Sequence, residues 1–151
     1  MSSDRPVAPG RAEYRAFRPL ATRWADNDVY GHVNNVVYYS FFDTAVNGYL
    51  VDAGALTVGV SPVIGLVVDS QCSYFASLAF PDRVEAGLRI DRLGRSSIAY
   101  GIGIFAEGAD RAAASGRFVH VTVDRETRRP VPVPETMRTA LAPLLAGSQE
   151  L

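Results

Sequence analysis

The stretch VVYYSFFDTAVNGYLV, residues 36–51, decides how this chain folds. Its polar residues fall at helical spacing and form one narrow stripe, while nearly every other position is apolar: Ser40, Asp43, Thr44 and Asn47 make up the stripe. A helix that is apolar over most of its circumference must be covered on several sides, unlike a surface helix with a single apolar face. The stretch therefore predicts a buried helix that other elements wrap.

Both ends of this helix carry signals. Ahead of it, Asn34 or Asn35 can accept hydrogen bonds from the free N–H groups of the first turn. Behind it, in the segment DAGAL, Gly54 suits a left-handed C-cap.

The rest of the chain shows strand patterns. One short extended segment lies within residues 14–24, and four further stretches follow the helix at 62–75, 83–91, 97–105 and 117–124. Short turns between strands imply antiparallel neighbours, so these four stretches are predicted to form a meander. The predicted fold class is α+β, an antiparallel β-sheet wrapped around a long central α-helix, with a Pro-rich segment and a short helix near Pro134 after it.

Length and composition restrict the function classes. The chain has 151 residues, which predicts one domain at 14–146 between a mobile N-terminal tail, 1–13, and a C-terminal tail, 147–151. Hydrophobic residues make up 48% and the formal net charge is -1, which argues against a disordered chain and against a nucleic-acid partner. A single cysteine, Cys72, and the lack of a long apolar segment predict a cytoplasmic protein with no membrane partner.

The segment WADNDVYGHVNN, residues 24–35, concentrates polar residues just ahead of the helix. It begins like a calcium loop, but Tyr30 and Val37 occupy two ligand positions, and two histidines with one cysteine spell out no zinc set. No metal is therefore expected. One interpretation is a plain surface turn in which Gly31 adopts a positive φ.

The second interpretation is chemical. Asp28 lies a few residues before the helix, where free N–H groups of Gly31, His32 and Val33 could polarise a carbonyl oxygen. A carboxylate beside such donors makes half of an acyl-transfer site.

The block RWADNDVYGHVNNVVYYSFFD, residues 23–43, resembles the signature of the hotdog-fold thioesterases of the 4-hydroxybenzoyl-CoA thioesterase type. Later segments, RLGRSSIAYGIGIF and VHVTVDRETRRPVPVPE, are similar to that family's later strands and closing Pro-rich segment. The resemblance covers roughly residues 17–144 and implies the same fold, a helix embraced by an antiparallel sheet.

The resemblance also implies residue roles. It assigns the catalytic carboxylate to Asp28 and supporting roles to Asp26, Asn34 and Asn35, with Gly31, His32 and Val33 as the carbonyl-polarising amides. The related plant acyl-carrier-protein thioesterases use an Asn where this chain has Tyr30, so a plant-type assignment does not follow.

Other polar residues are assigned more weakly. Arg95, Ser96 and Ser97 lie at a turn where the family meets the nucleotide of coenzyme A, although a solvated hairpin explains them equally well. Asp69, Gln71 and Ser73 share one strand face and either line the site across a dimer interface or face solvent. His120, between valines, is expected to be a hydrogen-bonded structural residue.

The resulting hypothesis is an acyl-CoA thioesterase without a cofactor, acting on an acyl-CoA or acyl-carrier-protein thioester. One curled sheet leaves an edge open, so a homodimer or homotetramer is expected. Two alternatives remain, a hotdog enoyl-thioester hydratase/dehydratase and a non-catalytic acyl-CoA binding protein. The hydratase pattern places its His five residues after the Asp, whereas Asp28 and His32 are four apart.

Overall fold

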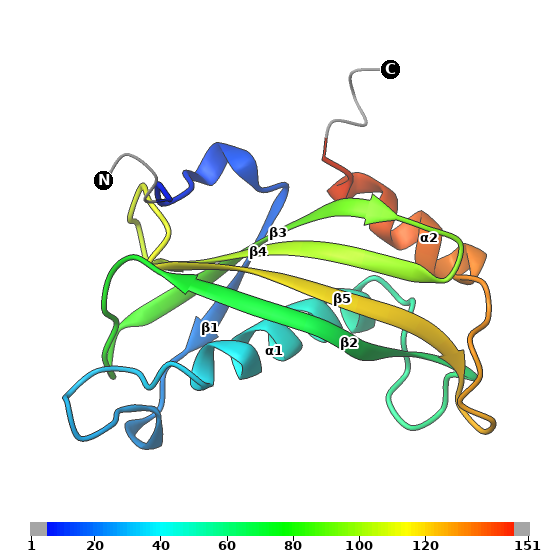
Figure 1. Cartoon of the computed structure of the whole chain (residues 1–151), viewed down its shortest axis with the longest axis horizontal. Coiled ribbons are helices and arrows are strands. Elements are labelled where there is room, and N and C mark those ends of the chain that lie inside the picture. Colours follow the sequence, from blue (N-terminus) through cyan, green and yellow to red (C-terminus); the bar gives the residue numbers. More distant parts are fainter. Residues whose placement is uncertain (1–5, 147–151) are drawn as a thin grey trace.

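A computed structural model of the chain describes residues 6–146. Five antiparallel strands form one sheet in the order β1-β3-β4-β5-β2. Their bounds are β1 (Ala16–Ala21), β2 (Val63–Tyr74), β3 (Arg83–Leu93), β4 (Ser97–Ala106) and β5 (Ala114–Asp124). The helix α1 (Val37–Asp52) runs along one face of this sheet (Figure 1). The predicted C-terminal tail, 147–151, and the first five residues of the predicted N-terminal tail lie outside the described residues.

The place of β2 in the sheet differs from the prediction. A meander would put β2 beside β3, but β2 pairs with β5 along its whole length, and β3 lies between β1 and β4. The rule that short turns join neighbouring strands holds for β3, β4 and β5. It fails for residues 75–82, which are long enough to cross the end of the sheet and place β2 at the edge opposite β1.

The helix α1 has sixteen residues and packs its apolar side on the sheet. Its buried residues are Tyr38, Phe41, Phe42, Ala45, Val46 and Leu50. The polar stripe is exposed at Ser40, Asp43 and Thr44. The sheet therefore covers one side of α1, with α2 (Glu135–Leu141) touching it as well, and the described chain leaves the polar stripe open.

Glycines set the spacing and the end of α1. A Cβ at Gly116 of β5 would clash with the ring of Phe42, so the missing side chain lets the helix approach the sheet. Gly54, with φ +77°, follows the C-cap residue Ala53, as the sequence predicts.

The segment ahead of β1 is docked on the outer face of the sheet, where the sequence predicts a mobile tail. The carbonyl of Pro9 accepts from the Ala112 N–H at 2.9 Å. The guanidinium of Arg11 lies 5.1 and 4.8 Å from the ring centroids of Phe17 and Phe105 and 2.6 Å from the Glu85 carboxylate. These contacts order residues 9–13, because aromatic rings and a carboxylate hold the arginine from three sides.

The chain after β5 forms a second helix that packs against α1. The helix α2 follows an N-cap at Pro134, the predicted start, and continues into a short 3-10 turn, η4 (Ala142–Leu144). The hydroxyl of Tyr49 on α1 donates to the Ala140 carbonyl at 2.7 Å and ties the two helices together. No helix within residues 6–146 is both long and apolar enough to cross a membrane.

Candidate active site

The loop between the 3-10 turn η3 (Trp24–Asp26) and α1 folds back on itself like a small hairpin. Asn27 and Val33 face each other across an isolated bridge. The Asp28 N–H donates to the His32 carbonyl at 3.0 Å, and the Gly31 N–H donates to the Asp28 carbonyl at 3.1 Å. Gly31 has φ +88°, so the predicted glycine turn is confirmed.

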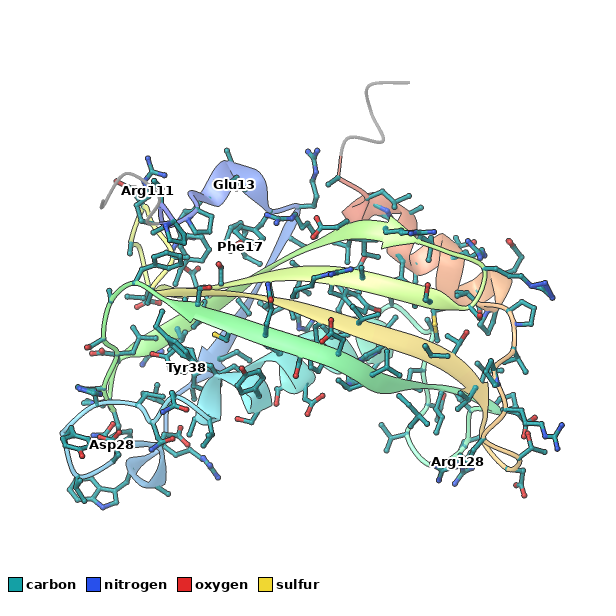
Figure 2. The ribbon with its side chains drawn as sticks, in the orientation of Figure 1. Glu13, Phe17, Asp28, Tyr38, Arg111 and Arg128 are labelled. Carbon is teal, nitrogen blue, oxygen red and sulfur yellow. The ribbon has the colours of Figure 1, made fainter. Side chains whose placement is uncertain are left out.

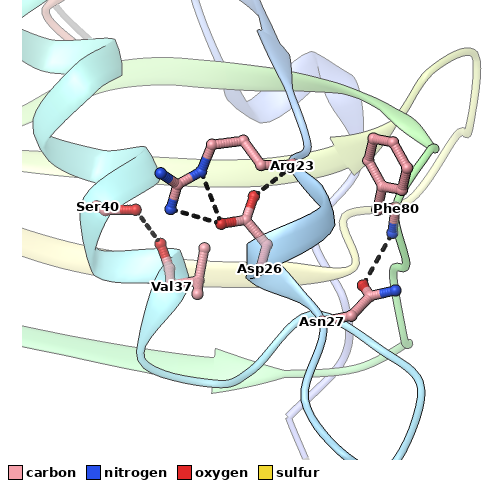
Figure 3. Close-up of polar contacts among 6 residues, drawn as sticks. All are labelled: Arg23, Asp26, Asn27, Val37, Ser40 and Phe80. Carbon is pink, nitrogen blue, oxygen red and sulfur yellow. Dashed lines mark hydrogen bonds and ion pairs between the residues drawn. The ribbon is translucent and has the colours of Figure 1, made fainter.

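The loop is tied to the segment that crosses the end of the sheet. The Val33 N–H donates to the Leu78 carbonyl at 2.7 Å, and the Asn27 side-chain carbonyl accepts from the Phe80 N–H at 3.0 Å (Figure 3). Leu78 is buried in the core, so this attachment anchors the loop to the sheet. The crossing of residues 75–82, absent from the sequence prediction, thus positions the site.

The carboxylate of Asp28 is half-buried and opens onto a pocket of about 300 Å³. Its Oδ1 accepts from the Tyr30 N–H at 2.9 Å, and its Oδ2 lies 3.5 Å from the Asn34 side-chain amide. Neither bond comes from a cation, so within residues 6–146 the carboxylate has no ion-pair partner.

Four segments wall this pocket. The loop contributes residues around Asp28 and His32, α1 contributes Tyr38, the end of β2 contributes Tyr74, and the crossing segment after it contributes Ala76 and Ser77. The tyrosine rings meet edge to face, with centroids 5.1 Å apart, and burial raises the pKa of Tyr38 to about 12. Figure 2 shows Asp28 and Tyr38 at the same end of the molecule.

The structure uses two of the three predicted carbonyl-polarising amides elsewhere. The Gly31 N–H donates to the Asp28 carbonyl within the hairpin. The Val33 N–H donates to the Leu78 carbonyl, the bond that anchors the loop. His32 N–H has no acceptor among residues 6–146, and neither has Asn35 N–H. Both residues line the pocket, so among residues 31–35 the amides free to act are those of His32 and Asn35. The sequence signal for Asn35 was its place just ahead of the helix.

Asn34 links the helix start to the carboxylate. Its side-chain carbonyl accepts from the Val36 N–H at 3.0 Å, and its backbone carbonyl accepts from the Val37 N–H at 2.9 Å. The predicted asparagine side-chain cap is therefore wrong: the N-cap is Val36 without a side-chain cap bond, and Asn34 serves the first turn only through its backbone carbonyl. The same side chain reaches Asp28 through its amide group.

Asp26 lies apart from the pocket. Its side chain is 1% exposed, and its two oxygens accept from the backbone N–H, Nε and Nη2 of Arg23 at 2.7, 3.0 and 2.8 Å (Figure 3). The Asp26 carbonyl accepts from the Asn34 N–H at 2.9 Å. Asp26 therefore supports the loop that carries Asp28.

The predicted coenzyme A residues are distant from Asp28 in one chain. Arg95 and Ser96 form the β3–β4 turn and Ser97 begins β4, at the end of the sheet opposite the Asp28 loop (Figure 1). The Ser96 carbonyl accepts from the Thr122 N–H, and the Arg95 carbonyl accepts from the Val133 N–H, which packs this turn against its neighbours. Asp69, Gln71 and Ser73 are exposed on the edge strand β2.

His120 is buried as predicted, but it is not fully hydrogen-bonded. Its Nε2 has no partner in the described chain, and the hydroxyl of Tyr100 beside it lacks one too. Burial lowers the pKa of His120 to about 4, so the ring is neutral near pH 7. Within residues 6–146, no group of three or more His, Cys, Asp or Glu side chains is placed to hold a metal ion.

Comparison with known proteins identifies the family. The family model of the thioesterase-like superfamily matches residues 22–141 of this chain. The crystal structure of the PA5185 protein from Pseudomonas aeruginosa strain PAO1 is similar, with 55% sequence identity over 95% of this chain and 100% of that chain and a TM-score of 0.91.

Two more distant relatives extend the likeness. PA2801 from Pseudomonas aeruginosa, described as a putative thioesterase, is 25% identical over 84% of this chain and 98% of its own, with a TM-score of 0.75. The uncharacterized protein YsmA of Bacillus subtilis (strain 168) is 22% identical over 85% of this chain and 86% of its own. The chain therefore belongs to the thioesterase-like superfamily, and it is a thioester hydrolase with the hotdog fold.

Proposed function

We propose that this protein hydrolyses an acyl-CoA or acyl-carrier-protein thioester with Asp28 as the reacting carboxylate. The observation that carries the proposal is the pocket itself, where the Asp28 carboxylate opens beside the free N–H groups of His32 and Asn35. A carboxylate can attack or deprotonate, and preorganised N–H donors stabilise the charge that develops on a thioester oxygen.

The donors precede α1, whose N-terminus adds a favourable field. The peptide dipoles of a helix sum to a partial positive charge at its start, and α1 begins two residues after Asn35. In this proposal a thioester oxygen binds at these amides and the carbonyl carbon is presented to Asp28, which lines the same pocket. Negative charge on the oxygen is then met by N–H groups that need no reorganisation during the reaction.

Two routes fit this arrangement. In the first, a carboxylate oxygen of Asp28 bonds to the carbonyl carbon, the C–S bond breaks and the thiolate leaves; water then opens the mixed anhydride and restores the carboxylate. In the second, Asp28 removes a proton from a water molecule whose oxygen attacks the carbon, and that proton passes to the departing thiolate. Thiols ionise near pH ~8.5, so neither route needs a strong general acid.

We also propose a homodimer or homotetramer, built through the open edge of the sheet. The edge strand β2 exposes Val67 and Val68 by 45% and 60%, and unpaired edges of this length invite pairing with another chain. Antiparallel pairing of two β2 strands would bring the β3–β4 turn of a second copy toward the Asp28 end. A coenzyme A role for Arg95, Ser96 and Ser97 requires such an assembly. Sedimentation of the protein as a monomer at assay concentration would contradict it.

The test of function is thiol release from a panel of short, long and aromatic acyl-CoAs and from acyl-carrier-protein thioesters. Asp28→Asn should lower kcat by about a hundredfold or more, since a positioned base alone contributes at least that much. Asp110→Asn is the matched control, because Asp110 is an exposed carboxylate in the β4–β5 turn, and it should leave kcat unchanged. An Asp28→Asn variant with nearly full turnover would overturn the assignment.

A further inference from the structure

We infer that Tyr74 is a positioning residue of the thioesterase site, because its hydroxyl holds the peptide group between Asn35 and Val36 and thereby orients the adjoining free amide of Asn35. The inference rests on the proposed function. Tyr74 does not touch the reacting atoms in this assignment. It acts on the loop that presents the donors.

The peptide group between Asn35 and Val36 is held at both of its polar atoms. The Tyr74 hydroxyl donates to the Asn35 carbonyl oxygen at 2.8 Å. On the other side of the same peptide, the Val36 N–H donates to the Asn34 side-chain carbonyl at 3.0 Å. A peptide held at both atoms cannot rotate without losing two hydrogen bonds, each of which contributes about 1 kcal/mol net.

The orientation of this peptide matters because of what it adjoins. Asn35 and Val36 are exposed, so without these bonds the peptide group would be free to turn in solvent. A turned Asn35–Val36 peptide would move the neighbouring Asn35 N–H and could direct a carbonyl oxygen toward the Asp28 carboxylate. The partial negative charge of that carbonyl oxygen, added to the charge of the Asp28 carboxylate, would oppose the binding of a thioester oxygen at the same place.

Packing on the sheet side fixes the tyrosine. Tyr74 is the last residue of β2, and its ring stands edge-on to the ring of Tyr38, which is 2% exposed. Tyr74 itself is 44% exposed, so its ring is seated on one side only, and the hydroxyl is the part that reaches the loop. The bond spans 39 positions in sequence, and it connects the edge strand directly to the start of α1.

The hydroxyl remains a donor across the working pH range. Burial raises the pKa of Tyr74 well above its usual value, so the phenol does not ionise under assay conditions. The site therefore draws on three elements: the loop supplies the carboxylate, α1 supplies the helix start, and β2 supplies the residue that fixes their relation.

The test is Tyr74→Phe, which keeps the ring and its contact with Tyr38 and removes only the hydroxyl. We expect kcat to fall about tenfold, because the transition state loses the positioning that one hydrogen bond provides. KM should stay unchanged within about twofold. The matched control is Tyr49→Phe. It removes another tyrosine-to-carbonyl bond, from the Tyr49 hydroxyl to Ala140, at the other end of α1, and it should leave kcat unchanged.

A second readout does not depend on turnover. In amide NMR spectra, Tyr74→Phe should shift the resonances of Asn35 and Val36 and speed hydrogen exchange at Val36, whereas Tyr49→Phe should not. Unchanged resonances would overturn the positioning role even if the protein proved to have no thioesterase activity. A change in KM alone would also overturn it, because Tyr74 would then be a substrate contact. Equal losses of kcat in both variants would overturn it too, because the Tyr74 hydrogen bond would then contribute only to the general stability of the protein.

Discussion

The carboxylates of Asp26 and Asp28 are two residues apart in the chain and face opposite surroundings. Asp26 is 1% exposed, and both of its oxygens accept from Arg23. Asp28 opens onto the pocket, and within residues 6–146 it accepts only from neutral donors of its own loop. The 3-10 turn η3 ends at Asp26, so the chain changes direction between the two residues. This change separates a carboxylate that holds Arg23 from one that opens onto the pocket.

Asp26→Asn should destabilise the protein without acting directly on chemistry. The change removes the charge that pairs with the Arg23 guanidinium and leaves a buried amide in its place. We expect the free energy of unfolding to fall by roughly 2 kcal/mol, as for a buried group that loses charge-assisted bonds. Urea denaturation measures it. At a temperature where the variant is folded, its kcat should exceed that of Asp28→Asn. A fully stable variant as inactive as Asp28→Asn would mean that Asp26 reacts with substrate.

Acid should unfold the protein partly through His120. Its pKa is about 4 in the folded protein and near 6.5 when exposed, because burial disfavours the charged ring. The unfolded state therefore binds the extra proton first as the pH falls, and stability is lost progressively between about pH 6.5 and pH 4. The linkage at pH 4.5 amounts to roughly 2 to 3 kcal/mol relative to pH 7.

His120→Gln isolates this contribution. The variant cannot titrate at this position, so the decrease in its unfolding free energy between pH 7 and pH 4.5 should be smaller than that of wild type by about the same amount. Urea denaturation at both pH values gives the comparison. Equal pH dependence in the two proteins would show that His120 does not titrate below its usual pKa in the fold.

Arg11→Ala should release the segment ahead of β1. It removes the contacts of the guanidinium with the Phe17 and Phe105 rings and its ion pair with Glu85, in which both side chains are about 30% exposed. The expected loss is roughly 1 to 2 kcal/mol of unfolding free energy. Arg15→Ala, at an exposed position nearby, is the control and should have little effect. If limited proteolysis cut the two variants equally slowly within residues 6–15, Arg11 would not be the anchor.

The prediction of the elements succeeded because local patterns specify them. The polar stripe of Ser40, Asp43 and Thr44 indicated a helix that buries its apolar side, and the alternation in residues 83–91 indicated a half-buried strand. The predicted wrapping was only partly right, because the sheet covers one side of α1. The turn at Gly31 and the cap at Gly54 followed from the positive φ that glycine adopts readily. These features depend on neighbouring residues, and the sequence contains them directly.

The amides of the site were harder to predict because they depend on distant partners. Gly31, His32 and Val33 are equivalent in sequence terms, yet Val33 donates to Leu78, which lies 45 positions further along the chain. No local pattern reveals that bond. Among the amides of residues 31–35, those of His32 and Asn35 are left without an acceptor in the described part of the chain, a result that requires the position of residues 75–82.

The sequence by itself determined the helix, the strands and the turn, because each follows from spacing and side-chain chemistry within a few residues. Only the tertiary structure decided that β2 crosses to the far edge of the sheet, which amides remain free, and that Tyr74 reaches the start of α1. Strand order and long-range hydrogen bonds depend on which surfaces pack against one another. They are therefore determined by the whole chain and not by any short segment.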